Sequence, residues 1–343
     1  MRLDRRGVLA TSLALGGAAT AAPVPGKIAL EEHVIIPSFL DYLNKAMPPV
    51  SAEARAVLVR RMLDFGEERL AAMDGAGVSR AILSISGPGV QVEPDTARAT
   101  RLAAEANDAL AREIQRRPDR YGGFAHLAMQ DPAQAARELE RCVRELNFQG
   151  AMINHHTLGV YLDDPRNDVF WERLQALEVP LYLHPDDSFR MPHVLEGVPE
   201  LHKPTWEWTT ETATHALRLI VTGVFDRFPR AQVILGHMGE TLPYMLWRLD
   251  SRYAFTPTRR PIRRKPSDYV RSNISVTTSG QCDDVPLTAA LAALGESRVM
   301  FSIDYPYEDS ATAARFIEKA AIAEDVRARV MHGNARALLK LRG

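Results

Sequence analysis

The chain has 343 residues, of which 46% are hydrophobic and 25% charged, and its formal net charge is −1. This composition is ordinary for a globular protein that can bury a sizeable core. A near-neutral charge provides no basic surface for nucleic acid or for an anionic membrane, so we expect a small-molecule partner. The two cysteines, Cys142 and Cys282, are too few for a disulfide framework or a cysteine metal site, and we expect both to be buried.

The first 22 residues differ from the rest of the chain. Arginines at positions 2, 5 and 6 precede an apolar stretch of small residues, 7–22, which is too short to be a stable membrane span. Ala19-Thr-Ala21 offers a signal-peptidase site. We therefore predict that 1–22 is a twin-arginine-like export signal, that the mature protein is periplasmic, and that no membrane contact remains after its removal. The alternative is a frayed amphipathic N-terminus on a cytoplasmic protein.

From residue 26 onwards, β-type apolar runs alternate with helical patterns. Eight strands are expected, at 27–30, 80–85, 121–127, 150–153, 179–184, 232–237, 273–278 and 298–304. Helices are expected between them, for example at 97–116 and at 133–146. This alternation predicts an α/β fold in which 26–343 forms a single (β/α)₈ TIM barrel. The segments 35–69 and 188–211 are expected to be helical insertions after strands one and five, on the side where the strands end.

Polar side chains stand at the ends of several of these strands. Glu31 and His33 follow the first strand and are two residues apart, so they project from the same face. His184 ends the fifth strand and Asp304 ends the eighth. The carboxyl ends of barrel strands meet at one mouth, so these four side chains can converge on one ion. Two imidazoles and two carboxylates suit a single Zn²⁺ or Mn²⁺. Each of these residues, taken alone, could instead be a hydrogen-bonded structural residue.

Six sequence motifs, several of which contain these strand ends, together resemble those of a known family. They are Gly26-Lys-Ile-Ala-Leu-Glu-Glu-His33, Pro180-Leu-Tyr-Leu-His-Pro185, Glu211-Thr-Ala-Thr-His-Ala-Leu-Arg-Leu219, Ile234-Leu-Gly-His-Met-Gly-Glu-Thr-Leu-Pro243, Trp247-Arg-Leu-Asp250 and Phe301-Ser-Ile-Asp-Tyr-Pro306. The chain is similar to amidohydrolase family 2 of the metal-dependent hydrolase superfamily, and within it to the γ-resorcylate and 2,3-dihydroxybenzoate decarboxylases. The similarity extends from about residue 26 to the C-terminus.

The resemblance implies a non-oxidative decarboxylase of an ortho-hydroxylated aromatic acid that uses one divalent metal ion and no organic cofactor. Glu31, His33, His184 and Asp304 would hold the metal. Asp304 would also act as the acid that protonates the ring, with His237 and Glu240 as its proton relay.

The same resemblance indicates residues that contact the substrate. Arg248 would bind the substrate carboxylate across a subunit interface of a dimer or tetramer. The alternative is an arginine on a helix surface that pairs with Asp250 or Glu240. Trp206, Phe189 and Tyr305 could form an aromatic wall for a flat ring, although such residues are more often part of the core.

Three departures from the family keep alternatives open. Asp186 and Asp187 follow His184-Pro185, where basic or amide residues are expected, and Val34 follows the Glu-x-His motif, where many relatives carry an aromatic residue. The third departure is the export signal, which is unusual for catabolic decarboxylases. One alternative is a hydrolase of a lactone or an amide that uses the same ligands to bind a metal hydroxide. The other is an exported metal-binding protein without catalytic activity, against which the intact His237, Glu240 and Asp304 argue.

Overall fold

A computed structural model describes residues 26–47, 50–257 and 261–341. Within them an eight-stranded sheet has the order β1 to β8, and each strand is parallel to the next. The strands are β1 Lys27–Val34, β2 Val78–Ile85, β3 Tyr121–His126, β4 Gly150–Asn154, β5 Leu181–His184, β6 Val233–Leu235, β7 Ile274–Thr277 and β8 Val299–Met300. The predicted barrel is therefore confirmed.

The predicted export signal lies outside the described residues, and none of the described helices has the length and apolar character needed to cross a membrane.

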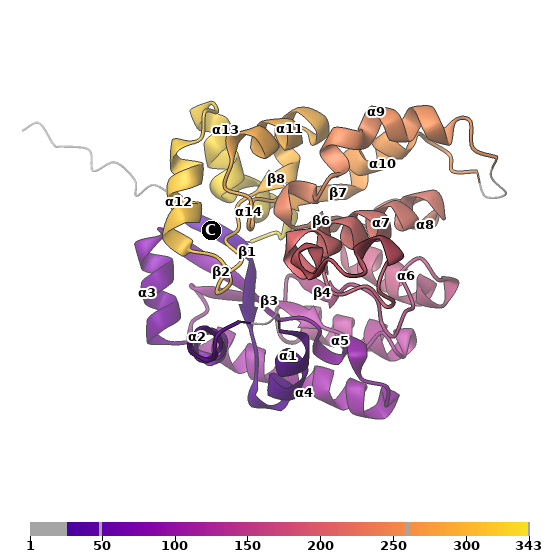
Figure 1. The fold of residues 1–343 in the computed structure, drawn as a ribbon. Helices are drawn as coiled ribbons and strands as arrows, with labels where there is room; N and C mark the ends of the chain where they lie inside the picture. Colours follow the sequence, from indigo (N-terminus) through magenta and orange to yellow (C-terminus); the bar gives the residue numbers. More distant parts are fainter. Residues whose placement is uncertain (1–25, 48–49, 258–260, 342–343) are drawn as a thin grey trace, which may run out of the picture.

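Helices surround the barrel on its outside (Figure 1). They are α1 Leu40–Ala46, α2 Ala52–Leu63, α3 Glu67–Gly75, α4 Thr96–Arg116, α5 Pro132–Arg144, α6 Asp168–Leu177, α7 Glu207–Val221, α8 Val224–Arg227, α9 Leu242–Tyr253, α10 Pro266–Asn273, α11 Asp284–Leu294, α12 Ser310–Lys319, α13 Glu324–Ala328 and α14 Asn334–Leu338. Asp95 and Asp131 cap α4 and α5, because their side chains accept hydrogen bonds from the first backbone N–H groups. Both predicted helices are thus confirmed to within two residues.

The two predicted insertions differ in structure. The segment after β1 is helical and forms α1 and α2. The segment after β5 contains only single 3₁₀ turns, at His193–Leu195, Pro199–Leu201 and Lys203–Thr205, before α7 begins. The prediction of a helical second insertion was wrong for most of its length, because the prolines at 192, 199 and 204 interrupt any longer helix.

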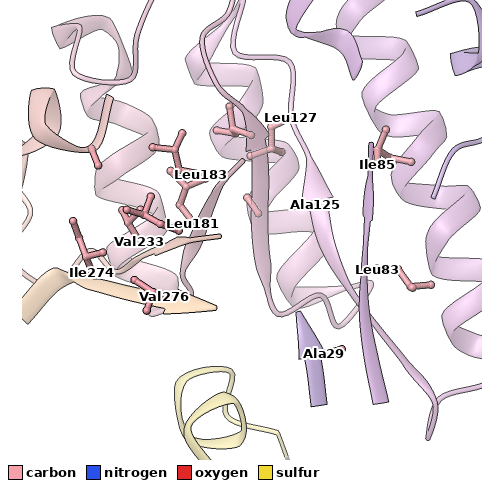
Figure 2. Packing of buried hydrophobic residues seen from close by; sticks show 14 of the residues in the cluster. Ala29, Leu83, Ile85, Ala125, Leu127, Leu181, Leu183, Val233, Ile274 and Val276 are labelled. Atoms are coloured by element: carbon pink, nitrogen blue, oxygen red, sulfur yellow. The ribbon is translucent and has the colours of Figure 1, made fainter. Parts of the chain in front are cut away.

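Alternate strand residues face two separate apolar layers. Side chains such as Ala29, Leu83, Leu181 and Val233 point outward to the helices (Figure 2). The residues beside them point into the barrel and fill its centre: Ile28, Leu30, Ile82, Phe124, Met152, Tyr182, Ile234 and Met300. This filled interior means that ligands can enter only above these side chains, at the carboxyl ends of the strands.

A bulge in β1 aims the first polar pair into the barrel. Ala29 pairs with Ala81 and Glu32 pairs with Leu83, so β1 has one more residue than β2 between these pairs. Strict alternation from Leu30 would turn Glu31 outward. The extra residue resets the alternation, so that Glu31 and His33 face inward while Glu32 faces outward.

The chain after β8 closes the barrel against β1. Asp304 donates its backbone N–H to the Glu31 carbonyl at 3.1 Å, and His33 donates to the Tyr305 carbonyl at 2.7 Å. Regular strand geometry ends at Met300, before the predicted end at Asp304, because the next N–H, that of Phe301, donates to the Val330 carbonyl outside the sheet at 2.8 Å. This closure brings the first and last strand ends of the chain together.

Candidate metal centre and active site

Three of the four predicted ligands form a buried cluster at the mouth of the barrel. Glu31, His33 and His184 each place a ligand atom within 4.8 Å of the other two, and all three side chains are buried. Asp304 lies next to them, with its Oδ1 3.1 Å from His33 Nε2. Glu31 Oε1, His33 Nε2 and Asp304 Oδ1 have no hydrogen-bond partner among the described residues. Buried polar atoms normally have hydrogen-bond partners. This set of unpaired ligand atoms, which converge on one point, therefore fits a bound divalent cation.

The surrounding side chains leave one oxygen of Glu31 free for the metal. The other oxygen, Oε2, accepts hydrogen bonds from the hydroxyls of Tyr182 and Ser279. Gly236 allows this approach, because a Cβ at that position would lie 2.8 Å from Oε2. Burial is the main cause that raises the pKa of Glu31. A cation at the free oxygen would favour the ionised carboxylate, which is the form that binds metals.

His237 connects Asp304 to Glu240. Its Nδ1 lies 2.9 Å from Glu240 Oε1, and its Nε2 lies 3.7 Å from Asp304 Oδ2. Burial alone would lower the pKa of His237, but the carboxylates of Glu240, Glu31 and Asp304 raise it well above its usual value. Burial would likewise raise the pKa of Asp304, but His237 and His33 outweigh it and lower that pKa to about 2. Both directions favour a proton on the His237 imidazole over a proton on the Asp304 carboxylate.

The backbone at this position is strained. His237, Met238 and Glu240 have φ values of 50°, 56° and 58°, in the region that favours glycine. Each such residue costs about 1–2 kcal/mol. Hydrogen bonds hold the turn in place: Ser279 Oγ accepts from the His237 N–H, and Thr209 donates to Glu240 Oε2 at 2.8 Å. The turn directs the imidazole of His237 toward Asp304.

A cavity of about 240 Å³ opens directly above the cluster. His184, His237 and Asp304 form its floor, and α1 contributes an apolar side through Leu43 and Ala46, next to Met47. Trp208, Pro185 and Pro204 close the other side. A cavity of about 150 Å³ holds benzene. The volume and the apolar sides therefore match one substituted aromatic ring that contacts the metal end with its polar edge.

The three residues predicted to bind substrate do not line this cavity. Trp206 is 46% exposed, whereas Trp208 lines the cavity, because residues two apart at the start of a helix point in nearly opposite directions. Phe189 is 56% exposed and lies on a neighbouring cavity. Arg248 is exposed on α9. None of the three therefore lines this cavity among the described residues, and their contacts with substrate stay predictions.

Tyr305 is buried in the core with the guanidinium of Arg69 4.6 Å from its ring centroid, and Tyr307 lines the cavity in its place. The sequence reasoning missed Tyr307. Its hydroxyl lies 2.8 Å from Ser86 Oγ, at the end of β2.

Cys142 is buried as predicted, but Cys282 is exposed, because it follows β7 in a loop.

The remaining buried histidines have structural hydrogen bonds. His126 Nε2 accepts from the Val90 N–H at 3.0 Å, and His215 Nε2 accepts from the Leu162 N–H at 2.9 Å. His155 is fully buried and donates from Nε2 to the Glu211 carboxylate at 3.0 Å. Burial lowers the pKa of His126 to about 3. The rings of His126 and His215 act as neutral acceptors, and none of these three histidines is part of the metal cluster.

The amidohydrolase family model matches residues 43–341. The chain belongs to the amidohydrolase family. It is 42% identical over 327 residues to a γ-resorcylate decarboxylase of Rhizobium radiobacter, covering 93% of this chain and 99% of the relative.

Solved structures agree with this assignment. A 2,6-dihydroxybenzoate decarboxylase in complex with 2,6-dihydroxybenzoate is 42% identical, covers 92% of this chain and 99% of its own, and superposes with a TM-score of 0.87. A dihydroxybenzoic acid decarboxylase of Polaromonas sp. JS666, with bound manganese and the inhibitor 2-nitroresorcinol, is 42% identical with a TM-score of 0.87, over 93% of this chain and 98% of its own. The predicted family and barrel are confirmed.

Proposed function

We propose that this protein is a metal-dependent, non-oxidative decarboxylase of an ortho-hydroxylated aromatic carboxylic acid. The observation that carries the proposal is the ring-sized cavity whose floor combines the metal cluster with the His237–Asp304 pair. The related enzymes named above act on dihydroxybenzoates, which is the substrate class that such a cavity would admit.

The chemistry requires protonation of the ring before CO₂ leaves. Direct loss of CO₂ would leave an unstabilised aryl carbanion. Protonation of the carbon that bears the carboxylate gives a species from which the C–C bond electrons return to the ring as CO₂ departs. Glu31, His33, His184 and Asp304 would hold the divalent ion, which when bound supplies the positive charge that orients the phenolate and carboxylate oxygens.

The chain's own residues supply the proton. His237 carries it on an imidazole that Glu240 fixes through Nδ1, so that Nε2–H faces Asp304. Asp304 lies between His237 and the metal cluster and can pass the proton to the ring carbon. The apolar side formed by Leu43 and Met47 keeps water from the ring.

We propose manganese as the working ion, in preference to zinc. The Polaromonas relative holds manganese, and a ligand set with two carboxylate oxygens suits that ion. Metal analysis of the purified protein tests this proposal: one manganese per chain is expected, and one zinc per chain would contradict it.

We also propose that α9 packs against a second copy and brings Arg248 to the partner's cavity. The same helix exposes Tyr244, Met245 and Trp247, the last of them 78% exposed. A contiguous apolar face of this kind is typical of an interface. Trp247→Glu should reduce the molar mass measured by light scattering to that of a monomer, whereas Val285→Glu, on exposed α11, should not. An unchanged mass for Trp247→Glu would contradict the interface.

Export of the protein by the segment 1–22 stays a prediction from the sequence. Fractionation of cells that express the full chain tests it, with Arg5→Lys/Arg6→Lys as the variant that retains the charge. A periplasmic wild type and a cytoplasmic variant are expected.

The function is tested with manganese-loaded protein and carboxyl-¹³C 2,6-dihydroxybenzoate in D₂O. Release of ¹³CO₂ and one deuterium on the former carboxyl carbon are expected. His237→Asn should lose turnover by roughly 10²–10⁴-fold, the usual range for a general acid, and keep its metal. His193→Asn, the same change at an exposed histidine, should be unchanged.

Two outcomes would contradict the proposal. One is the absence of CO₂ from every ortho-hydroxybenzoate tried. The other is cleavage of a lactone or amide with solvent ¹⁸O in the product, which would identify the protein as a hydrolase.

A further inference from the structure

We infer that Asp186 is a specificity-determining residue that selects aromatic acids carrying a further hydrogen-bond donor, such as a hydroxyl, on the part of the ring away from the metal. The inference rests on the proposed function and specifies the substrate class of the same cavity. Asp186 follows β5 two residues after the ligand His184 and lines the cavity together with Ser86, Gly87 and Tyr307.

The geometry leaves one oxygen of Asp186 available to a ligand. Oδ1 accepts the backbone N–H of Asp187 at 2.7 Å. No hydrogen bond among the described residues involves Oδ2, which faces Gly87, where the missing side chain leaves room beside it. The residue is only 9% exposed. Oδ2 is not one of the fully buried unpartnered atoms, so it is accessible from the cavity, and a donor on the substrate can replace water there.

The charges around Asp186 favour a neutral donor over a second carboxylate. The nearby cation, Lys203, is bound to both oxygens of Asp187. Among the described residues that line the cavity there is no arginine and no lysine, whereas Asp304 and Glu308 add negative charge. A ring with a second carboxylate at this end would thus meet like charge, without a counter-ion among the described residues that line this cavity. Lys45 lines the adjoining cavity, and Arg248 of the partner subunit would bind the reacting carboxylate.

Space does not limit the group at this position. Asp186 also lines a second cavity, of about 480 Å³, which shares Ala46 with the first. A hydroxyl and a methoxy group can therefore both be accommodated near Oδ2, and discrimination between them would reflect hydrogen bonding.

The test compares binding of matched ligands by calorimetry to manganese-loaded protein at pH 8.5. The ligands are 2-hydroxybenzoates with either a hydroxyl or a methoxy group at each remaining ring position. At one of these ring positions, the wild type should bind the hydroxyl compound at least about tenfold more tightly than the methoxy compound. This is the difference expected for a hydrogen bond to a charged acceptor. Asp186→Asn places a donor where Oδ2 was and should reduce this ratio to about twofold or less.

Asp187→Asn is the matched control, with the same change one residue along, and should keep the wild-type ratio. Equal binding of the hydroxyl and methoxy compounds by wild type at every position would overturn the inference even if Asp186→Asn failed to fold. So would an unchanged ratio in folded Asp186→Asn. Release of CO₂ measured on the same compounds separates the two proposals: the expected binding pattern without CO₂ refutes only the decarboxylase, and CO₂ release without the pattern refutes only the role of Asp186.

Discussion

Gly89 lies in the loop after β2 that holds one side of the cavity, and Gly89→Ala should destabilise the protein through a specific clash. Gly89 has a φ of +57°, which costs alanine about 1 kcal/mol. The new Cβ would lie 2.3 Å and 2.5 Å from two atoms of the buried His126 ring. Overpacking of this kind costs about 1–3 kcal/mol, and displacement of the ring also weakens its hydrogen bond to Val90, worth about 1 kcal/mol. We expect a total loss of about 3–5 kcal/mol.

Gly197→Ala provides the control, because Gly197 has a φ of +79° but no atom within 4 Å of the position of a Cβ. It should cost about 1 kcal/mol or less. Urea unfolding of both variants measures the difference. The double variant Gly89→Ala/His126→Ala should be less destabilised than the sum of the single variants, by about 2 kcal/mol, since the clashing atoms are gone. Equal losses in the two glycine variants, or simple additivity in the double variant, would refute the reasoning.

Three further predictions concern the metal, the pH dependence of stability and a helix cap. Gly236→Ala should weaken manganese binding at least tenfold in a calorimetric titration, because its Cβ would lie 2.8 Å from Glu31 Oε2; unaltered affinity would show that the carboxylate can adjust. Burial lowers the pKa of His126 from 6.5 to about 3, so the unfolded chain takes up a proton that the folded chain does not. Stability should therefore fall as pH drops below 6.5, with a His126 share of about 1.3 kcal/mol between pH 7 and pH 5.5 that is missing in His126→Gln. Asp131→Ala should cost about 1 kcal/mol in urea unfolding, and Asp131→Asn, which keeps the cap, should cost much less.

Much of the barrel was predictable from the sequence, because its strands are short and almost entirely buried. Apolar runs such as 179–184 end in a polar residue where the strand meets the mouth, and this position alone placed His184 correctly. Glu31 and His33 were assigned to the same face from their spacing. That conclusion was right, although the spacing could not reveal the bulge that turns this face inward.

The sides of the cavity were less predictable, because they belong to loops. Whether Trp206 or Trp208 faces the ring depends on the residue at which α7 begins, and helix ends are the least certain feature of a sequence pattern. Tyr307 follows a turn in which it donates its N–H to the Asp304 carbonyl and Asp304 has a positive φ, and the apolar pattern of the strand does not reveal this turn. Asp186 was recognised as a departure from the family, but only the structure shows that Oδ2 faces the space for the ring.

The positive φ values of the site occur where the chemistry requires fixed side chains. Asp304, His237 and Glu240 all have backbone angles that a glycine would adopt at less cost, yet each needs its side chain for the proton path. If β6 ended with regular strand geometry, the His237 side chain would point in another direction, because successive strand side chains alternate between the barrel interior and the helices. The bulge in β1 solves the same problem for Glu31. At both strand ends the barrel holds the backbone rigidly, and a local departure from strand geometry points the side chain into the site. Changes that relax these departures should therefore stabilise the backbone while they reduce turnover.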